Sequence, residues 1–361
     1  KNTEYGRCAH IDETYLKKFR LKKNNKISIM FNASDLIKQD SFVVNRLNKV
    51  FNSKKKIIDI VRIATHSKDL NKIKKYLDYF KNRGLKICLN LMQINTVSKN
   101  DLKNNLKLLS KWKNVDVFYF ADSFGNLKPK DVKNICSTIK SNWNKEFGIH
   151  SHNNCKLALK NSIMAFKNGA NWIDGTIQGM GRGAGNVKTE DLLKYFKNFH
   201  YKPDKLSSIS KGLFFELKKK FKWGPSNFYK IAAKFNIHPT YIQTLLMDSR
   251  YKKSEIKKSI LNLSKLDSKG YDPRVLEKIS AVDKNFKGKW NAKNWCKNRN
   301  IIILGQGESL KENYNLKEIT KILIEKKPIV LSLNINNFVP EAYIDYFVSS
   351  TELRILTDHK L

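Results

Sequence analysis

Six short apolar stretches alternate with amphipathic stretches between residues 26 and 197, and this alternation constrains the fold more than any other feature. Nearly continuous apolar strands separated by helices are typical of a parallel sheet whose faces are covered by helices. The apolar stretches, which we predict to be strands, are 27–31, 57–63, 85–91, 115–120, 148–152 and 172–177. The amphipathic stretches, which we predict to be helices, include 71–82, 100–109, 129–141 and 156–168.

About six strand–helix units in roughly 170 residues account for most of a (β/α)₈ barrel, in which ligands bind at the carboxyl ends of the strands. We therefore predict an incomplete TIM (β/α)₈ barrel over residues 1–200. A doubly wound open sheet is the alternative fold.

Two histidines lie on the predicted strand 148–152. Side chains at positions i and i+2 of a strand point to the same face, so His150 and His152 share a face while Ser151 points to the other. Two imidazoles that converge from one strand can bind a single divalent metal ion. The alternative is a pair of histidines that face solvent or form ordinary hydrogen bonds.

A glycine-rich loop follows the predicted strand 172–177. Glycine occupies every second position from 179 to 185, and Asn186 then precedes a predicted helix. Glycine permits positive φ angles and lets the backbone approach a ligand closely, so we predict substrate contacts at Gly181 and Gly183. The amide oxygen of Asn186 could bind a metal ion, or the residue could cap the helix that follows.

Four motifs occur in a fixed order: VRIATH at 61–66, FADSFG at 120–125, the H-x-H strand, and the G-x-G-x-G-A-G-N loop. In this order they resemble the DRE-TIM metallolyase superfamily. Within it, the chain is most similar to the 4-hydroxy-2-oxovalerate aldolase family. The resemblance covers roughly residues 1–200 closely and extends more weakly to about residue 280.

The resemblance implies a role for each matched residue. His150, His152 and Asn186 match the metal site, and Asp122 with Ser123 matches a strand-end pair that borders the substrate. The cluster of Arg62, Thr65 and His66 matches a strand end that faces the barrel. We therefore predict Arg62 and Asp122 as catalytic residues and Ser123 and Thr65 as substrate-binding residues. Alternatively, Asp122 caps a helix, Arg62 forms an internal ion pair, and His66 is an ordinary loop residue.

One element of the superfamily is missing. In the superfamily, the first strand of the barrel carries an Asp-x-x-x-Arg-type element that supplies a carboxylate metal ligand and a catalytic arginine. In this sequence, residues 6–10 already match the region after the family's second strand. We therefore expect that the sequence lacks the first β-α-β unit and is a fragment of a longer protein. Such a barrel exposes two sheet edges. The histidine that serves as the aldolase's base is missing too, and His10 does not match it.

The resemblance implies a divalent-metal-dependent aldolase that cleaves or forms a 4-hydroxy-2-oxo acid through a metal-bound pyruvate enolate. Mn²⁺ is favoured, and Mg²⁺, Co²⁺ or Zn²⁺ would also suit nitrogen and oxygen ligands. One alternative is an acyl-CoA-dependent Claisen condensing enzyme of the isopropylmalate synthase type. Another is a non-catalytic barrel in a surface-polysaccharide biosynthesis protein. Hydroxymethylglutaryl-CoA lyase activity is disfavoured because the glycine loop contains no cysteine.

Residues 201–290 change character. Stretches 206–221, 226–235, 239–247 and 253–263 are predicted to be helices without strands between them. The resemblance implies a helical domain that covers the mouth of the active site and contacts an aldehyde dehydrogenase partner; a homo-oligomer is the other expectation. In the family, a tyrosine of this domain donates a proton. Tyr229 and Tyr241 are candidates here, and packing between helices is the alternative for each.

Residues 291–361 form a third region with a small Rossmann-like pattern. Predicted strands at 301–304, 329–333 and 353–356 alternate with predicted helices at 316–325 and 340–347, and the pattern looks truncated at Leu361. Gly305, Gly307 and Ser309 follow the first strand, where a nucleotide phosphate would meet a helix start. A tight turn without a ligand is the alternative, and Glu308 disfavours a phosphate.

Composition narrows the remaining classes of protein. The net charge of +38 comes mainly from lysines spread over every predicted helix, without the arginine and aromatic arrangements that recognise nucleic acid. No apolar run reaches about 18 residues, so we expect no membrane span. The five cysteines are scattered and show no C-x-x-C spacing, which favours reduced thiols and a cytoplasmic location.

Overall fold

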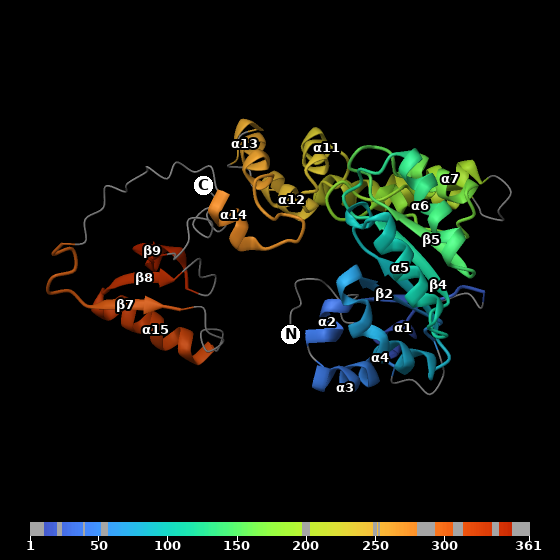
Figure 1. Ribbon diagram of the computed structural model, residues 1–361. Coiled ribbons are helices and arrows are strands. Elements are labelled where there is room, and N and C mark those ends of the chain that lie inside the picture. Colours follow the sequence, from blue (N-terminus) through green and yellow to red (C-terminus); the bar gives the residue numbers. More distant parts are fainter. Residues whose placement is uncertain are drawn as a thin grey trace. The chain divides into compact units, whose positions relative to one another are not determined.

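The computed structural model divides into two compact units, residues 1–234 and 235–361 (Figure 1). The residues that it describes are 11–19, 24–38, 40–51, 57–196, 203–247, 251, 253–279, 293–305, 313–333 and 339–348. The predicted three-part division, with boundaries near 200 and 290, remains a prediction.

The first unit is built on a parallel sheet of six strands. Neighbouring strands follow one another in chain order and pair in parallel throughout. A doubly wound sheet reverses its strand order at a switch point, and this sheet does not, so the TIM-barrel prediction is confirmed and the open-sheet alternative is wrong. The strands are β1 (Ser28–Asn32), β2 (Ile60–Thr65), β3 (Lys86–Leu91), β4 (Val117–Asp122), β5 (Glu146–Ser151) and β6 (Trp172–Ile173).

Helices connect the strands and cover one face of the sheet. In α4, Ile73, Tyr76, Leu77 and Phe80 recur at helical spacing and are buried. The outward-facing strand residues, such as Phe118, join them in one hydrophobic core. The helices of this unit are α1 (Glu13–Leu16), α2 (Ala33–Lys38), α3 (Asp40–Val50), α4 (Leu70–Lys81), α5 (Lys99–Ser110), α6 (Pro129–Asn142), α7 (Ala158–Lys167) and α8 (Thr189–Tyr195).

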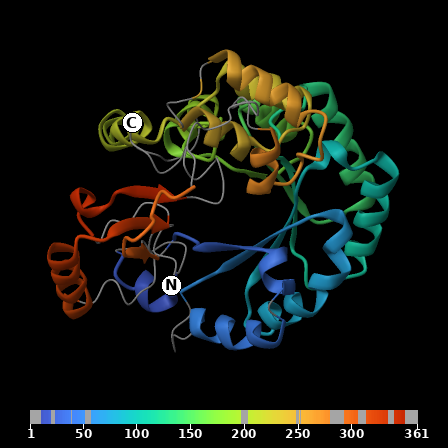
Figure 2. The ribbon, with the colours of Figure 1, turned by 90° about the vertical axis from the view of Figure 1, so that its left-hand side faces the viewer.

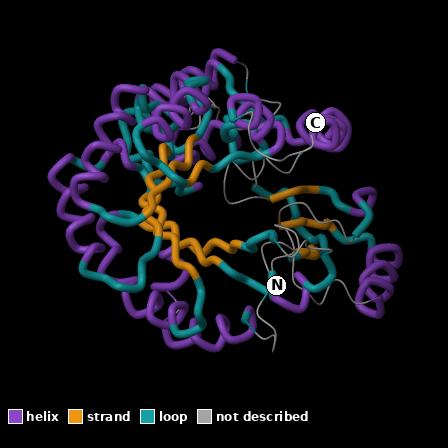
Figure 3. Tube along the Cα trace, turned by 90° about the vertical axis from the view of Figure 1, so that its right-hand side faces the viewer, coloured by secondary structure: helices purple, strands orange, loops and turns teal. Residues whose placement is uncertain are grey.

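The opposite face of the sheet is concave. Figures 2 and 3 show the strands along the inner side of a curved wall whose outer side carries the helices of residues 70–167. Ile60, Cys88, Val117 and Tyr119 form a small apolar cluster on this face. Among the described residues, β1 and β6 each have only one neighbouring strand, so the barrel is not closed. On β1, Met30 is 58% exposed as a result.

The last strand of this sheet is shorter than predicted. It ends at Ile173 rather than at residue 177. Beyond it, Thr176 bonds to the backbone of Val187 and Thr189, and residues 177–179 form a 3₁₀ turn in which Gln178 has a φ of 54°. The chain therefore turns toward the segment that follows the glycine loop instead of continuing along β5.

Helices follow, as predicted. The segment from 203 to 221 is continuous through α9 (Pro203–Ile209), a π-helical turn (Ser210–Phe214) and α10 (Phe215–Phe221), and α11 (Asn227–Lys234) ends the first unit. In the second unit, α12 (Pro239–Met247) and α13 (Lys253–Leu263) have the predicted bounds, and α14 (Pro273–Ile279) follows. No helix in the described part of the chain is long and apolar enough to span a membrane.

A three-stranded parallel sheet lies in the C-terminal region. Its strands are β7 (Ile301–Leu304), β8 (Ile329–Leu333) and β9 (Tyr346–Val348), and α15 (Asn313–Lys326) connects the first two. The predicted helix 340–347 is wrong: a 3₁₀ turn (Glu341–Tyr343) leads into β9, because Asp345 pairs with Val330 through its backbone and its carboxylate. Gly305 follows β7, whereas Gly307, Ser309 and the predicted strand 353–356 lie outside the described residues.

Candidate active site

Polar side chains gather on the concave face toward the carboxyl ends of the strands. The alternation that places Ile60 and Cys88 on this face also places Arg62 and Asn90 there, because each lies two residues further along its strand. His150 lies on this face too, because it is two residues beyond Gly148, the partner of Tyr119 on β5. Asp174 lies two residues beyond Trp172, just after β6. Three strands and the segment just after β6 thus contribute to one polar surface above the apolar cluster.

Arg62 and Asp174 form an ion pair across this face. Arg62 Nη1 donates to Asp174 Oδ1 at 2.9 Å, and Nη2 lies 2.8 Å from Oδ2. The guanidinium carbon also lies 4.1 Å from the centre of the Tyr119 ring. Burial opposes ionisation of Asp174, but the hydrogen bond with His150 and the charge of Arg62 outweigh it and lower the pKa of Asp174 to about 2. Arg62 therefore forms an internal ion pair, which was the alternative to the substrate contact expected from the sequence.

His150 is held by the same carboxylate. Its Nδ1 lies 2.7 Å from Asp174 Oδ2, so Nε2 is the nitrogen that remains for a metal ion. The His150 and His152 rings lie 5.0 Å apart at an interplanar angle of 78°. Ser151 is buried on the helix-covered face, as the strand alternation predicts.

The glycine loop is fixed beside His152. Asn186 forms an antiparallel backbone bridge with His152, and Asn153 N–H donates to Gly185 O at 2.9 Å. Asn186 Nδ2 donates to Met180 O at 3.1 Å, while its Oδ1 is buried without a hydrogen-bond partner among the described residues. An amide oxygen left in this way, on a residue paired with His152, suits a metal ion or a substrate hydroxyl.

The glycines of the loop are required by close packing rather than by flexibility. A Cβ on Gly181 would lie 2.6 Å from Asn186 Nδ2, and a Cβ on Gly185, whose φ is 74°, would overlap the carbonyl oxygen of Gly179. A segment from the region after the barrel packs on the same loop: Trp223 Nε1 donates to Gln178 O at 3.1 Å, and Gly224 N–H donates to Gly183 O at 3.0 Å. The loop is therefore a closely packed wall of the site.

Asp122 shapes the turn after β4. Its carboxylate is fully buried and accepts hydrogen bonds from the backbone N–H of Asn126 at 3.1 Å and of Leu127 at 3.3 Å. Burial raises the pKa of Asp122 to about 7, although these hydrogen bonds act in the opposite direction. The contacts correspond to the capping role that was the alternative to catalysis.

The pKa shift of Asp122 predicts how stability depends on pH. Because the folded-state pKa lies above the unfolded value of about 3.9, the protonated carboxyl stabilises the fold below pH 4, and this contribution is lost as the pH rises through about 7. Between about pH 4 and pH 7, the free energy of unfolding of the wild type should therefore fall, relative to that of Asp122→Asn, by up to about 1.4 kcal/mol per pH unit. Urea unfolding of both proteins at pH 5 and pH 7 measures this, and an unchanged difference would contradict it.

The other predicted substrate residues support loops at the strand ends. Ser123 Oγ accepts a hydrogen bond from Gln93 N–H at 2.9 Å. Thr65 is fully buried, and its Oγ1 donates to His66 O at 3.2 Å. Burial lowers the pKa of His66, which precedes a short 3₁₀ turn. Their roles toward a substrate remain predictions.

The two tyrosine candidates are buried. Tyr229 lies in α11, and burial raises its pKa to about 12. Tyr241 lies in α12, where its hydroxyl donates to Gly270 O at 3.0 Å and accepts from Asp272 N–H at 2.8 Å. These contacts correspond to the packing alternative for Tyr241.

The residues present fit part of a metal site. His150 and His152 offer imidazole nitrogens, and Asn186 offers an unpartnered oxygen. In the described segments, no group of three or more His, Cys, Asp or Glu side chains is placed to hold a metal ion. The described cysteines 88, 136, 155 and 296 are free thiols.

Two residues of the site were missed in the sequence. Asp174 directly follows β6, the strand that pairs with the H-x-H strand. A carboxylate at the carboxyl end of a barrel strand was the sequence signal that could have identified it. Asn90 is 4% exposed and interrupts the apolar run 87–91, and its Oδ1 has no hydrogen-bond partner in the described part of the chain. A lone amide within an apolar strand was the signal for Asn90.

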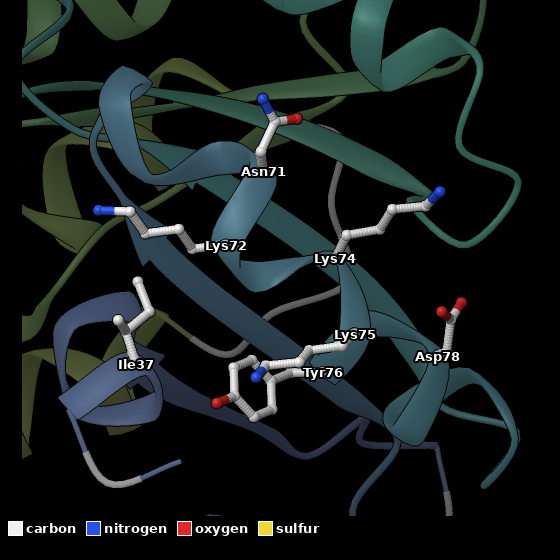
Figure 4. A pocket seen from close by; sticks show the side chains of 7 residues that line it. All are labelled: Ile37, Asn71, Lys72, Lys74, Lys75, Tyr76 and Asp78. Atoms are coloured by element: carbon white, nitrogen blue, oxygen red, sulfur yellow. The ribbon is translucent and has the colours of Figure 1, made fainter.

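A hollow of about 550 Å³ lies elsewhere, on the helix side of the sheet (Figure 4). Figure 4 shows Lys72 and Lys74 pointing in different directions from α4, with Lys75 beside the ring of Tyr76. Its lining contains neither histidine nor cysteine: Ile37, Asn71, Lys72, Lys74, Lys75, Tyr76 and Asp78. The hollow therefore contains few side chains that could bind a metal ion or act in catalysis, and the concave face is the better candidate for the active site.

Curated proteins resemble part of the chain. Two 4-hydroxy-2-oxovalerate aldolases are similar: that of Bacillus thuringiensis is 33% identical over 145 residues, which is 40% of this chain and 42% of that protein. That of Pelotomaculum thermopropionicum is 32% identical over 200 residues, which is 55% of this chain and 56% of that protein. The chain thus spans about half the length of the curated relatives it matches.

Solved structures share the fold. The N-terminal domain of a proposed aldolase from Bacteroides vulgatus superposes with a TM-score of 0.56 at 29% identity, over 65% of this chain and 77% of that one. The carboxyl transferase domain of Rhizobium etli pyruvate carboxylase, solved with pyruvate and biocytin, gives 0.52 at 11% identity, over 66% and 43% of the two chains, which shows the fold alone. The HMGL-like family model matches residues 7–205. The superfamily predicted from the four motifs is confirmed, and the chain belongs to the HMGL-like family.

Proposed function

We propose that the protein is a divalent-metal-dependent aldolase that cleaves or forms a 4-hydroxy-2-oxo acid. The observation that carries this proposal is the meeting of the H-x-H strand with Asn186, whose buried Oδ1 has no hydrogen-bond partner among the described residues. Relatives named 4-hydroxy-2-oxovalerate aldolase support the substrate class.

Each residue of the site has a proposed task. His150 Nε2, His152 and Asn186 Oδ1 would hold the metal ion, and Asn90 would offer a hydrogen-bond acceptor to the substrate. When bound, a divalent ion stabilises the negative charge that develops on a 2-oxo acid as its carbon–carbon bond breaks. The glycine loop, which Trp223 contacts through the carbonyl of Gln178, would hold Asn186 in place beside the H-x-H strand.

The finer assignments rest on donor chemistry and on the relatives. Two imidazoles with an amide oxygen suit Mn²⁺, and Mg²⁺, Co²⁺ and Zn²⁺ are the competing ions. Pyruvate is the proposed 2-oxo product, and an aldehyde dehydrogenase is the proposed partner for the aldehyde. The four cysteines of the described residues are free thiols, which suits the reducing conditions of a cytoplasm, the proposed location.

A substrate comparison tests the proposed function. Full-length protein with Mn²⁺ should release pyruvate from 4-hydroxy-2-oxopentanoate, and a chelator should stop the release. Thiol release from acetyl-CoA in the presence of a 2-oxo acid would instead establish the Claisen condensing alternative. Absence of both reactions, together with retained metal binding, would remove the aldolase assignment.

A further inference from the structure

We propose that Asp174 is a positioning residue that fixes the ring of His150 for metal binding, and that Arg62 holds Asp174 in place rather than binding substrate. This inference rests on the proposed function, because it gives His150 a metal ion to bind. It changes the role predicted for Arg62 and assigns one to Asp174.

Both oxygens of the Asp174 carboxylate are engaged by neighbouring side chains. Oδ2 lies 2.7 Å from His150 Nδ1 and 2.8 Å from Arg62 Nη2, while Oδ1 accepts from Arg62 Nη1 at 2.9 Å. The side chains of Arg62 and Asp174 are only 18% and 20% exposed. A carboxylate occupied in this way supports other groups instead of binding a metal ion itself.

The contact with His150 determines which ring nitrogen carries hydrogen. An ionised carboxylate can only accept hydrogen bonds, so His150 Nδ1 must donate to Asp174. In neutral His150 the lone pair then lies on Nε2, on the far side of the ring from Asp174. Histidines that bind metals through one nitrogen commonly donate the other N–H to a carboxylate, which orients the ring.

Arg62 supplies the fixed point of this arrangement. Its guanidinium makes two contacts with the carboxylate and lies 4.1 Å from the Tyr119 ring centre, so its own position is restricted. Tyr119 is buried in the apolar cluster at the base of the concave face. The chain of contacts therefore runs from the barrel core through Arg62 and Asp174 to His150.

The test uses two readouts on the full-length protein. Long-range ¹H–¹⁵N NMR of metal-free protein reports the tautomer of His150, and titration calorimetry reports the affinity for Mn²⁺. The key variant is Arg62→Met/Asp174→Ala, which removes both charges together and so leaves no buried unpaired ion. Asp174→Asn is the conservative variant, since its amide oxygen can still accept from Nδ1. Lys86→Met/Glu146→Gln is the control, because it removes an exposed ion pair, 2.6 Å apart, at the amino end of the sheet.

Wild-type His150 should carry hydrogen on Nδ1, and the double variant Arg62→Met/Asp174→Ala should show a mixture of tautomers. Its Mn²⁺ affinity should fall by about tenfold to 100-fold, with a smaller loss in Asp174→Asn and none in the control. An unchanged tautomer in the double variant would overturn the inference, whatever the protein's metal affinity. If the tautomer changes while even the wild type binds no Mn²⁺, positioning by Asp174 stands and the proposed metal-dependent function fails.

Discussion

Gly185→Ala should destabilise the first unit by about 3 kcal/mol or more and abolish the candidate site. The residue has a φ of 74°, and a Cβ there would overlap the carbonyl oxygen of Gly179, a backbone atom that cannot rotate away. Movement of Gly179 would disturb Asn186, whose N–H donates to that same carbonyl at 3.1 Å. The loss of stability and the loss of metal affinity should therefore appear together.

Urea unfolding followed by circular dichroism measures the change in stability, and Gly212→Ala is the matched control. Gly212 lies in a π-helical turn of the same unit, and a Cβ there would meet no atom within 4 Å. We expect the control to be neutral or slightly stabilising, since alanine favours helix. Equal effects of the two substitutions would show that the glycine loop is not closely packed.

Arg62→Met should destabilise the protein by about 3 kcal/mol, because it leaves the mostly buried Asp174 carboxylate without its cation. Arg62→Met/Asp174→Asn should recover much of this loss, since both charges are then absent. The ion pair would thus contribute less to stability than the single substitution suggests.

A double-mutant cycle of the free energies of unfolding separates these contributions. The cycle consists of wild type, Arg62→Met, Asp174→Asn and the double variant. We expect the double variant to lose less stability than the sum of the single losses. Simple additivity would contradict direct coupling between Arg62 and Asp174, which their 2.8 Å contact requires.

Local periodicity was sufficient to predict much of the fold. The bounds of α12 and α13 match the predicted helices, because their apolar residues recur at helical spacing. Alternation along β5 correctly placed His150 opposite Ser151, and the ring of His152, just beyond the strand, lies 5.0 Å from that of His150. These features depend on neighbours within one element, which a single sequence contains.

Features that depend on distant partners were not predictable in this way. Residues 340–347 were expected to form a helix, but Asp345 pairs with Val330 on a neighbouring strand. Here the tertiary contacts of an extended segment override the local propensity for a helix. The role of Asp174 likewise depends on Arg62, which lies 112 positions away in the sequence. The contacts of Asp122 with the backbone of residues 126 and 127 could not be predicted from the sequence either, and its catalytic role remains a prediction.

The central claim is that the H-x-H strand and Asn186 form a metal site, and Mn²⁺ binding to full-length protein tests it most directly. Titration calorimetry and the electron paramagnetic resonance spectrum of bound Mn²⁺ should show one site in the wild type. Its affinity should fall by about 100-fold or more in His150→Ala/His152→Ala and remain unchanged in His238→Ala, a histidine of the second unit. Equal Mn²⁺ affinity in the wild type and the His150→Ala/His152→Ala variant would contradict the account.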